Sequence, residues 1–496
     1  MREILNKLRN KELDILFFIM LLVSIVSLCV VVNCYDELWN FANSYKMFNG
    51  YKIYESLNVI VTPLFFYISQ IFFKIFGPNY LAFRIYNIFI STTFLILVFF
   101  ILKSLKVVRR RSIFYAFIVT FIFSFMITGG ANYNMLAVIP VLIEILLIIK
   151  RKRNAILEGV LLFFSFMVKQ TVFIYFAIGI FMYELLYREN IKKMIINLLR
   201  IYSIACIGIL IFLIYMYIDN NLYNFINYCF LGINEFGTNN FGIDFSGARY
   251  IYTSLIIVMF DLFIIFNKKI NENTDKAVIE NIKTLLCFGA PLLLMSFPII
   301  NYYHSTLGSL VVFIGFLYII ENVLIKNLKI NMVVEKVLYI TIMIFIIGVF
   351  AVIIIKAVIG NKVILNNSEG PLYGSLTTKE IDKDIEIVCN YVVEQQKNGM
   401  DVKILSYKAN LYMIHLNENN GVFDLPSLGN MGKGGEEELI EKIEGLQNTL
   451  ILIQTDEEKI FWQESKKIRK HIINNYKKVG EISEYSVYYI ESISEK

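Results

Sequence analysis

Two adjacent carboxylates, Asp36 and Glu37, directly follow the first long apolar segment of the chain, which ends near Asn33. Charge at a membrane boundary costs little only where it faces water or a partner, so such a pair is a candidate functional site. A carboxylate placed there could act as a general base on an acceptor hydroxyl. The alternative is that the pair caps the following helix, with Asp36 at the N-cap and Glu37 in the first turn.

A second set of candidates consists of polar side chains predicted to lie beside the outer ends of apolar segments. Oriented positive charge can stabilise a leaving phosphate. The set suits a substrate with an aliphatic tail, a phosphate and a polar head. We therefore predict substrate or phosphate binding by Lys169, Arg249, Arg84 and Tyr303, with His304 beside them.

Each of these residues also has a structural interpretation. Arg84 near a helix end could snorkel towards the membrane surface. His304, beside Tyr302 and Tyr303, could belong to an aromatic belt at the interface. Lys169 is harder to explain structurally, because it interrupts an apolar region.

The composition identifies the class of protein that must position these groups. Of 496 residues, 57% are hydrophobic and only 18% are charged, whereas soluble domains carry about 25% charged residues. The mean hydropathy is +0.60. The chain is therefore predicted to be a polytopic α-helical protein of the cell membrane, in contact with lipids and with no nucleic-acid partner. The six cysteines form no C-x-x-C pair, which argues against a zinc site or a disulfide framework.

Apolar runs and the positions of Lys and Arg together predict about eleven spans. No small-residue cleavage site follows 13–33, so this run is interpreted as a span rather than a signal peptide. The run 63–77 is too short to cross comfortably and is predicted to be an interfacial helix. Residues 155–187 could form one long span or two short ones that meet at Lys169, and we choose two. The predicted spans are 13–33, 80–105, 113–128, 133–149, two within 155–187, 195–218, 250–266, 284–301, 306–325 and 337–358.

This arrangement has a strong charge asymmetry. Residues 1–359 contain 31 Lys and Arg, of which 24 fall on one predicted side of the membrane. Basic residues favour the cytoplasmic side, so we predict a cytoplasmic N-terminus. An outer loop at 34–79 then carries the acidic motif.

The tail differs from the rest of the chain in charge. Residues 1–359 have a net charge of +12, whereas residues 360–496 have a net charge of −6. We therefore divide the chain into a membrane domain, 1–359, and an extracytoplasmic α/β domain, 360–496. The Gly-rich turn at 429–435 lacks the order of a phosphate loop. It is more simply a flexible loop than a nucleotide site.

The outer loop resembles a known family. An acidic pair, Asp36-Glu37, is followed by the segment Gly50-Tyr51-Lys52-Ile53-Tyr54-Glu55. Pro63-Leu64, Phe76-Gly77 and Phe83-Arg84 come next in order. This series resembles the first outer loop of GT-C glycosyltransferases, which include protein O-mannosyltransferases and lipid A aminoarabinose transferases. The short spans around Lys169 and an external domain after the last span are also similar to that family.

The resemblance implies an activity and roles for residues. It implies a cell-envelope enzyme that moves a sugar, with inversion, from a polyprenyl-phosphate donor to an acceptor on the outer face. Asp36 would be the base, with Glu37 beside it, and Lys169 or Arg249 would bind the lipid phosphate. Glu55 matches a second acidic position that in some members holds a divalent metal with a histidine, for which His304 would serve.

Two other classes of function fit the same composition and charge distribution. A transporter or flippase of a lipid-linked saccharide would favour internal repeats, and the sequence shows none. A membrane scaffold would tolerate changes at Asp36. The sequence leaves open the sugar and the acceptor, which could be a protein, a lipid or a cell-wall polymer.

Overall fold

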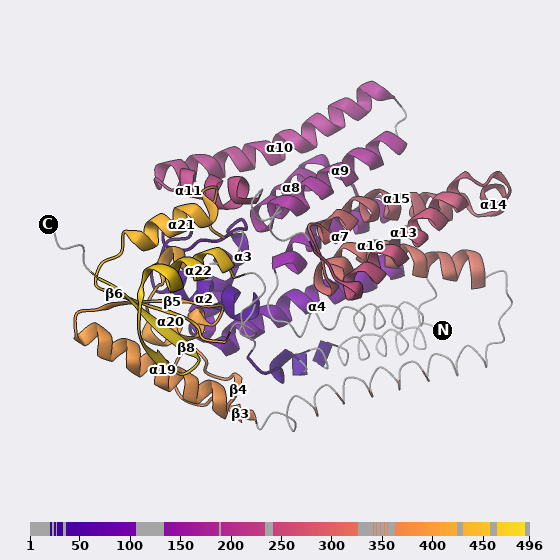
Figure 1. The fold of residues 1–496 in the computed structure, drawn as a ribbon. Coiled ribbons are helices and arrows are strands. Elements are labelled where there is room, and N and C mark those ends of the chain that lie inside the picture. The colour runs from indigo at the N-terminus through magenta and orange to yellow at the C-terminus, as the bar shows by residue number, and fades with distance from the viewer. Residues whose placement is uncertain are drawn as a thin grey trace. The chain divides into compact units, whose positions relative to one another are not determined.

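The computed structural model divides the chain into two compact units (Figure 1). The helical unit consists of 1–29, 87–212 and 242–356, and the loop–tail unit consists of 30–86, 213–241 and 357–496. The predicted outer loop is thus grouped with the tail. The structure describes residues 20–21, 24–25, 27–32, 36–105, 133–187, 190–233, 242–325, 363–423, 430–456 and 464–491, with five isolated positions between 341 and 355.

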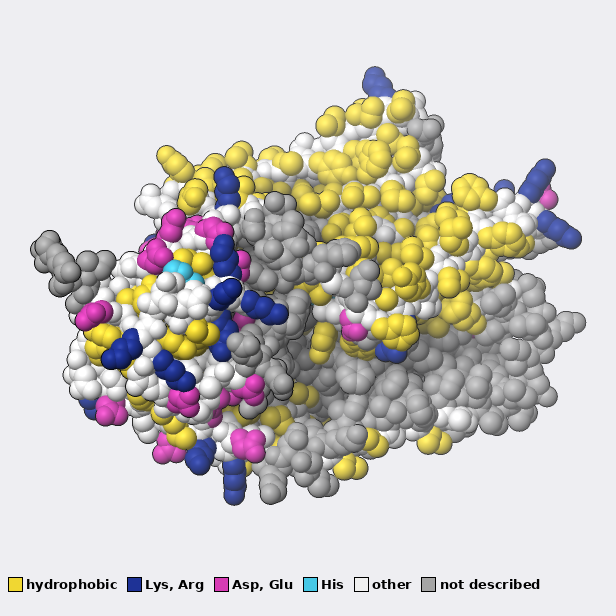
Figure 2. Space-filling model, in the orientation of Figure 1, with side chains coloured by type: hydrophobic (Ala, Val, Ile, Leu, Met, Phe, Trp, Pro, Cys, Tyr) yellow, Lys and Arg dark blue, Asp and Glu magenta, His cyan; other side chains and the backbone are white. Residues whose placement is uncertain are grey.

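Long apolar helices dominate the helical unit, and hydrophobic side chains cover most of their described surface in Figure 2. Within the described residues, five helices are long and apolar enough to cross a membrane. Four apolar helices of 10–17 residues accompany them. The chain is therefore a polytopic helical membrane protein. The long helices are α4 (Tyr80–Ser104), α10 (Ile191–Ile218), α13 (Phe245–Phe266), α15 (Lys276–Leu292) with its 3-10 extension η2 (Leu293–Ser296), and α16 (Tyr302–Ile319) with its extension η3 (Ile320–Ile325).

Most predicted spans that fall on described residues coincide with helices. The spans 80–105 and 133–149 match α4 and α7 (Tyr133–Ile149), and the predicted interfacial helix matches α3 (Leu64–Phe76). The predicted spans 113–128, most of 13–33 and most of 337–358 lie outside the described residues. The number of spans therefore stays a prediction.

The ambiguous region 155–187 folds as a helical hairpin. Helix α8 (Ala155–Val168) ends and α9 (Gln170–Leu186) begins at Lys169, whose backbone is extended at φ −157° and ψ 116°. Arg153 and Glu184, at the far ends, are only 2.6 Å apart. One continuous helix would separate them by roughly 45 Å. The prediction of two short segments that meet at Lys169 is confirmed.

The beginning of α15 differs from the prediction. The apolar run begins at Thr284, but the helix begins two turns earlier at Lys276, because the Asp275 side chain caps it by accepting a hydrogen bond from the Ala277 N–H. A short helix, α14 (Lys268–Asn273), precedes it. Hydropathy alone does not detect such a polar, capped beginning.

The loop–tail unit contains the acidic motif on a helix. Helix α2 (Asp36–Phe48) begins at the acidic pair and packs against α3 through aromatic side chains such as Trp39 and Phe66. The 213–241 segment contributes α11 (Leu222–Ile226) and a π-helical turn, η1 (Asn227–Leu231). The helical unit carries a short parallel pair, β1 (Gly242–Ile243) with β2 (Ile299–Ile300).

The end of the chain forms a four-stranded mixed sheet in the order β5-β6-β8-β7. Strands β5 and β6 are parallel, and the other neighbours are antiparallel. The tail also has a small antiparallel pair, β3 with β4. The tail elements are β3 (Val363–Leu365), β4 (Leu376–Thr378), α19 (Lys379–Lys397), β5 (Asp401–Leu405), α20 (Ala409–Leu416), η4 (Gly421–Phe423), α21 (Gly435–Glu444), β6 (Thr449–Gln454), α22 (Lys466–Asn475), β7 (Lys477–Ile482) and β8 (Tyr485–Ile490).

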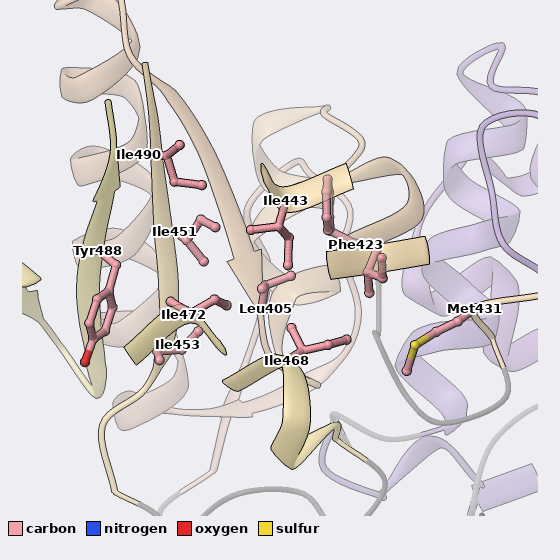
Figure 3. Close-up of a cluster of buried hydrophobic side chains, with 11 residues drawn as sticks. Leu405, Phe423, Met431, Ile443, Ile451, Ile453, Ile468, Ile472, Tyr488 and Ile490 are labelled. Atoms are coloured by element: carbon pink, nitrogen blue, oxygen red, sulfur yellow. The ribbon is translucent and has the colours of Figure 1, made fainter. Parts of the chain in front are cut away.

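Both faces of this sheet are covered by helices. Alternate residues of β6 and β8, such as Ile451 and Ile490, pack against α21 and α22 on one face (Figure 3). On the other face the Tyr485 ring lies against Tyr412 of α20. Period-two alternation places successive side chains of a strand on opposite faces, and here both faces are apolar.

A buried carboxylate makes the stability of this sheet region sensitive to pH. Burial raises the pKa of Glu464 to about 7, although the Tyr407 N–H donates to it at 2.7 Å. A raised carboxyl pKa means that the folded state holds the proton more tightly, so the stabilisation is complete below the unfolded pKa and is lost as pH rises to about 7. We expect a loss of about 2–3 kcal/mol between pH 4.5 and 7.5. Hydrogen exchange of α22 in the full chain, corrected for intrinsic rates, measures it.

The matched control is Glu464→Gln, which keeps the shape but cannot titrate. Its α22 protection should be independent of pH over the same interval. Equal pH dependence in the variant and the parent would assign the effect to another group.

Candidate active site

The acidic pair at the beginning of α2 divides into two different environments. Glu37 is buried, with 1% of its side chain exposed, and forms a bidentate ion pair with Arg84 of α4. The Arg84 Nε and Nη2 atoms donate to the two carboxylate oxygens at 2.5 and 3.0 Å, and Nη1 donates to the Val30 carbonyl at 2.9 Å. Asp36, one residue earlier, is exposed.

This geometry bears on the roles predicted for Arg84 and Glu37. The Arg84 guanidinium is 4% exposed, is committed to Glu37 and lies over the Tyr80 ring. The ion pair holds the beginning of α2 against α4, and the roles of Arg84 in substrate binding and of Glu37 in catalysis stay predictions. A buried bidentate pair holds both groups in one geometry. Asp36 is the exposed carboxylate at this end of α2.

The second acidic position, Glu55, lies in an exposed ion-pair group. Lys52 Nζ is 3.0 Å from Asp219 Oδ1 and 3.6 Å from Glu55 Oε2. The hydrogen bond and charge of Asp219, followed by the charge of Glu55, raise the pKa of Lys52. The neighbouring Tyr54 is buried, in the left-handed region at φ 67°, and its hydroxyl donates to the Val61 carbonyl. Tyr54 therefore shapes the loop and does not face a ligand.

A seam of amide side chains joins the loop to the tail within the loop–tail unit. Lys46 of α2, which is 1% exposed, donates to Asn410 Oδ1 of α20 at 3.0 Å. The Val32 N–H, just before the acidic pair, donates to the Leu376 carbonyl at 2.8 Å. The further contacts are Asn49–Asn417, Asn58 to the Asn430 carbonyl, Asn419 to the Ser56 carbonyl and the Lys433 N–H to Asn227. The tail therefore hydrogen-bonds to the chain on both sides of Asp36, at Val32 and at Lys46.

The helical unit gathers the predicted phosphate ligands at the beginnings of its helices. Lys169, at the tip of the hairpin, hydrogen-bonds to Asn134 and lies 5.4 Å from the centre of the Tyr133 ring. Lys169 also interacts electrostatically with His304 near the beginning of α16. The His304 Nδ1 atom is 2.9 Å from Asn301 Oδ1, which also caps α16.

Aromatic rings connect the same region to Arg249. The Tyr302 ring contacts both Tyr303 and Tyr250, and the Arg249 guanidinium lies 5.3 Å from the centre of the Tyr250 ring. Arg249 and Tyr303 are exposed. Close backbone packing brings α13 against the beginning of α16, since a Cβ atom at Gly247 would lie 2.5 Å from the Asn301 carbonyl carbon. Helices α9, α13 and α16 thus present cationic and aromatic side chains at their beginnings.

The two predicted metal ligands, Glu55 and His304, belong to different units, and the metal site stays a prediction. Glu55 is paired with Lys52, and His304 is bonded to Asn301 in the other unit. Throughout the described ranges, no group of three or more His, Cys, Asp or Glu side chains could hold a metal ion. No step of the chemistry below is therefore assigned to a metal.

The Gly-rich turn does not have the features of a nucleotide site. Gly432 and the Lys433 N–H pack on Asn227. The following helix, α21, begins with three consecutive glutamates, Glu436 to Glu438. These carboxylates occupy the end of the helix dipole that would otherwise attract a phosphate.

Two site residues were missed in the sequence, Asn134 and Asn301. Each lies at the beginning of an apolar helix and bonds to a predicted ligand, Lys169 or His304. Neutral amides give no signal in a charge count. Their position near a predicted outer end of an apolar run was the available indication.

The long apolar helices define the class as a polytopic helical membrane protein. Among solved structures, the chain is similar to ArnT from Cupriavidus metallidurans in its apo state. The likeness covers 97% of this chain and 98% of that chain, with a TM-score of 0.58 and 10% sequence identity. ArnT is a lipid A aminoarabinose transferase of the GT-C class.

The chain therefore has the fold of ArnT, and at 10% sequence identity this likeness shows the fold alone. No family model matches the sequence. No curated protein matches it either.

Proposed function

We propose that this protein is an inverting glycosyltransferase that moves a sugar from a polyprenyl-phosphate donor to an acceptor on the outer face of the membrane. The observation that carries the proposal is the division of the acidic pair: Glu37 is held by Arg84, whereas Asp36 stays exposed at the beginning of α2. The GT-C fold supports the choice of class.

In the proposed reaction, Asp36 takes the proton of an acceptor hydroxyl or amine. The acceptor atom attacks the anomeric carbon as the bond from that carbon to the phosphate oxygen breaks, which inverts the configuration. Polyprenyl phosphate leaves with its negative charge. Lys169 and Arg249 supply positive charge for that phosphate, and Tyr303 lines its approach.

The test is transfer or release of sugar by the purified full chain in lipid nanodiscs, with a panel of radiolabelled polyprenyl-phosphate monosaccharides. We expect one donor to be consumed, with equimolar polyprenyl phosphate formed. Binding of a donor without turnover, together with its movement across a sealed vesicle, would contradict the enzyme and support a flippase.

A further inference from the structure

A groove of about 730 Å³ lies between α8 and α10 in the helical unit. The two helices touch closely where glycines allow it: a Cβ atom at Gly159 would lie 2.7 Å from the Ile201 carbonyl, and one at Gly208 would lie 2.7 Å from the Phe163 ring. Gly159 of α8 contacts Ile201 of α10, and Phe163, further along α8, contacts Gly208, further along α10. The two helices therefore run in the same direction. Helix α8 begins at Ala155, whereas α10 begins well before that level, at Ile191. The groove is the space left beside the first turn of α8.

The walls of this groove are apolar and open to the membrane. Ile156, Ile196 and Leu199 are 65%, 41% and 60% exposed. Such surfaces are solvated by acyl chains in a bilayer and do not by themselves select a ligand. The lining consists of Asn154, Ala155, Ile156, Ile196, Leu199, Arg200, Ser203 and Ile204.

The selective feature is Arg200. It lies within a candidate membrane span, is exposed, and has no hydrogen bond or ion pair with any residue in the described part of the chain. Arg153, one residue before the groove, is instead held by three glutamates. An ionisable side chain in a span marks a functional site by default. A guanidinium beside an apolar groove matches a phosphate group that carries acyl chains.

Further basic residues near the Asn154 end of the groove also favour binding of a phosphate group. Arg151 and Lys152 are exposed and lie three and two residues before Asn154. The distribution of Lys and Arg predicts that this end of α8 is cytoplasmic, and basic pockets between helices on that side bind acidic lipid head groups. Lys169 lies at the opposite end of α8, roughly 20 Å away along the helix. The groove is therefore separate from the proposed donor-phosphate site.

We propose that this groove binds one acidic phospholipid of the inner leaflet. The lipid phosphate pairs with Arg200, and its acyl chains lie along Ile156, Ile196 and Leu199. The site is independent of the proposed transferase activity.

The test measures lipid retention by the full chain. Delipidated protein is exchanged into nanodiscs of phosphatidylcholine with a small fraction of phosphatidylglycerol, and the lipids that stay bound are counted by native mass spectrometry. We expect one retained phosphatidylglycerol, and about tenfold or greater weakening in Arg200→Gln, which removes the charge but keeps a polar side chain. Ser203→Trp, at an exposed position that lines the groove, fills it with a bulky ring and should have the same effect.

The matched control is Lys192→Gln, an exposed cation of the same helix that does not line the groove. It should retain the lipid as the parent does. Thermal unfolding of each variant shows whether it is folded. Equal retention by Arg200→Gln, equal retention of phosphatidylcholine, or displacement of the phospholipid by equimolar polyprenyl phosphate would each overturn the proposal.

Discussion

Replacement of Asp36 by Asn is expected to lower the rate of sugar transfer by about 10²–10⁴-fold, the contribution that a positioned general base supplies. Asparagine has nearly the same shape and is also accepted at helix beginnings, so the fold should be unchanged. The donor KM should stay near its original value, because the base acts on the acceptor. Initial rates with the active donor, and thermal unfolding of the same preparation, measure both effects.

The control for this prediction is the neighbouring carboxylate. Glu37→Gln should mainly lower stability, because it leaves Arg84 buried without its charged partner. The two variants therefore separate chemistry from architecture at adjacent positions. Normal turnover by Asp36→Asn would place the base elsewhere, and equal loss of stability in both variants would give Asp36 only a structural role.

Replacement of Arg153 by Ala is expected to have the largest effect on stability. Arg153 bonds to Glu158 and Glu184 at 2.6 Å and lies 3.7 Å from Glu144. The three carboxylates come from α8, α9 and α7, and the side chains of Glu144 and Glu158 are at most 1% exposed. Removing the guanidinium leaves buried negative charges without compensation, which costs about 3–5 kcal/mol. The midpoint of thermal unfolding in detergent measures the loss.

Lys152→Ala is the matched control, because Lys152 is an exposed cation next in sequence. Its unfolding midpoint should equal that of the parent. Adding Glu158→Gln to Arg153→Ala should recover part of the stability, since one of the unpaired charges is then removed. If Arg153→Ala has the same unfolding midpoint as the control, the ion pairs of Arg153 with the three glutamates do not stabilise the hairpin.

The helices of the membrane part could be predicted from apolar length, and the hairpin at Lys169 from the distribution of charge. The partner of Glu37 could not be predicted, because Arg84 lies 47 positions away and a list of outer charges does not pair them. Strand β7 was missed for a different reason. Its residues Lys477–Ile482 are almost all exposed and include only two apolar side chains, Val479 and Ile482. The strand pairs with β8 alone at the edge of the sheet. Such an edge strand has no apolar alternation to detect.

The candidate site could likewise be predicted only in part from the sequence. The types of its groups, a carboxylate on the loop and cations at the beginnings of helices, followed from the sequence. The distinction between Asp36 and Glu37 did not, because it depends on which carboxylate the guanidinium reaches. The metal ligands Glu55, which matches a family position, and His304 stay predictions; in the structure Glu55 lies near Lys52 and His304 near Asn301.

The amide seam between loop and tail has a consequence for recombination between related proteins. The residues that contact across it, such as Lys46 with Asn410 and Asn58 with Asn430, lie more than 360 positions apart in the chain. A chimera that exchanges the tail alone would therefore separate matched partners. Exchange of 30–86, 213–241 and 357–496 together keeps the matched partners in one protein. These three segments would therefore have to be exchanged as one unit, although they are not contiguous in the chain.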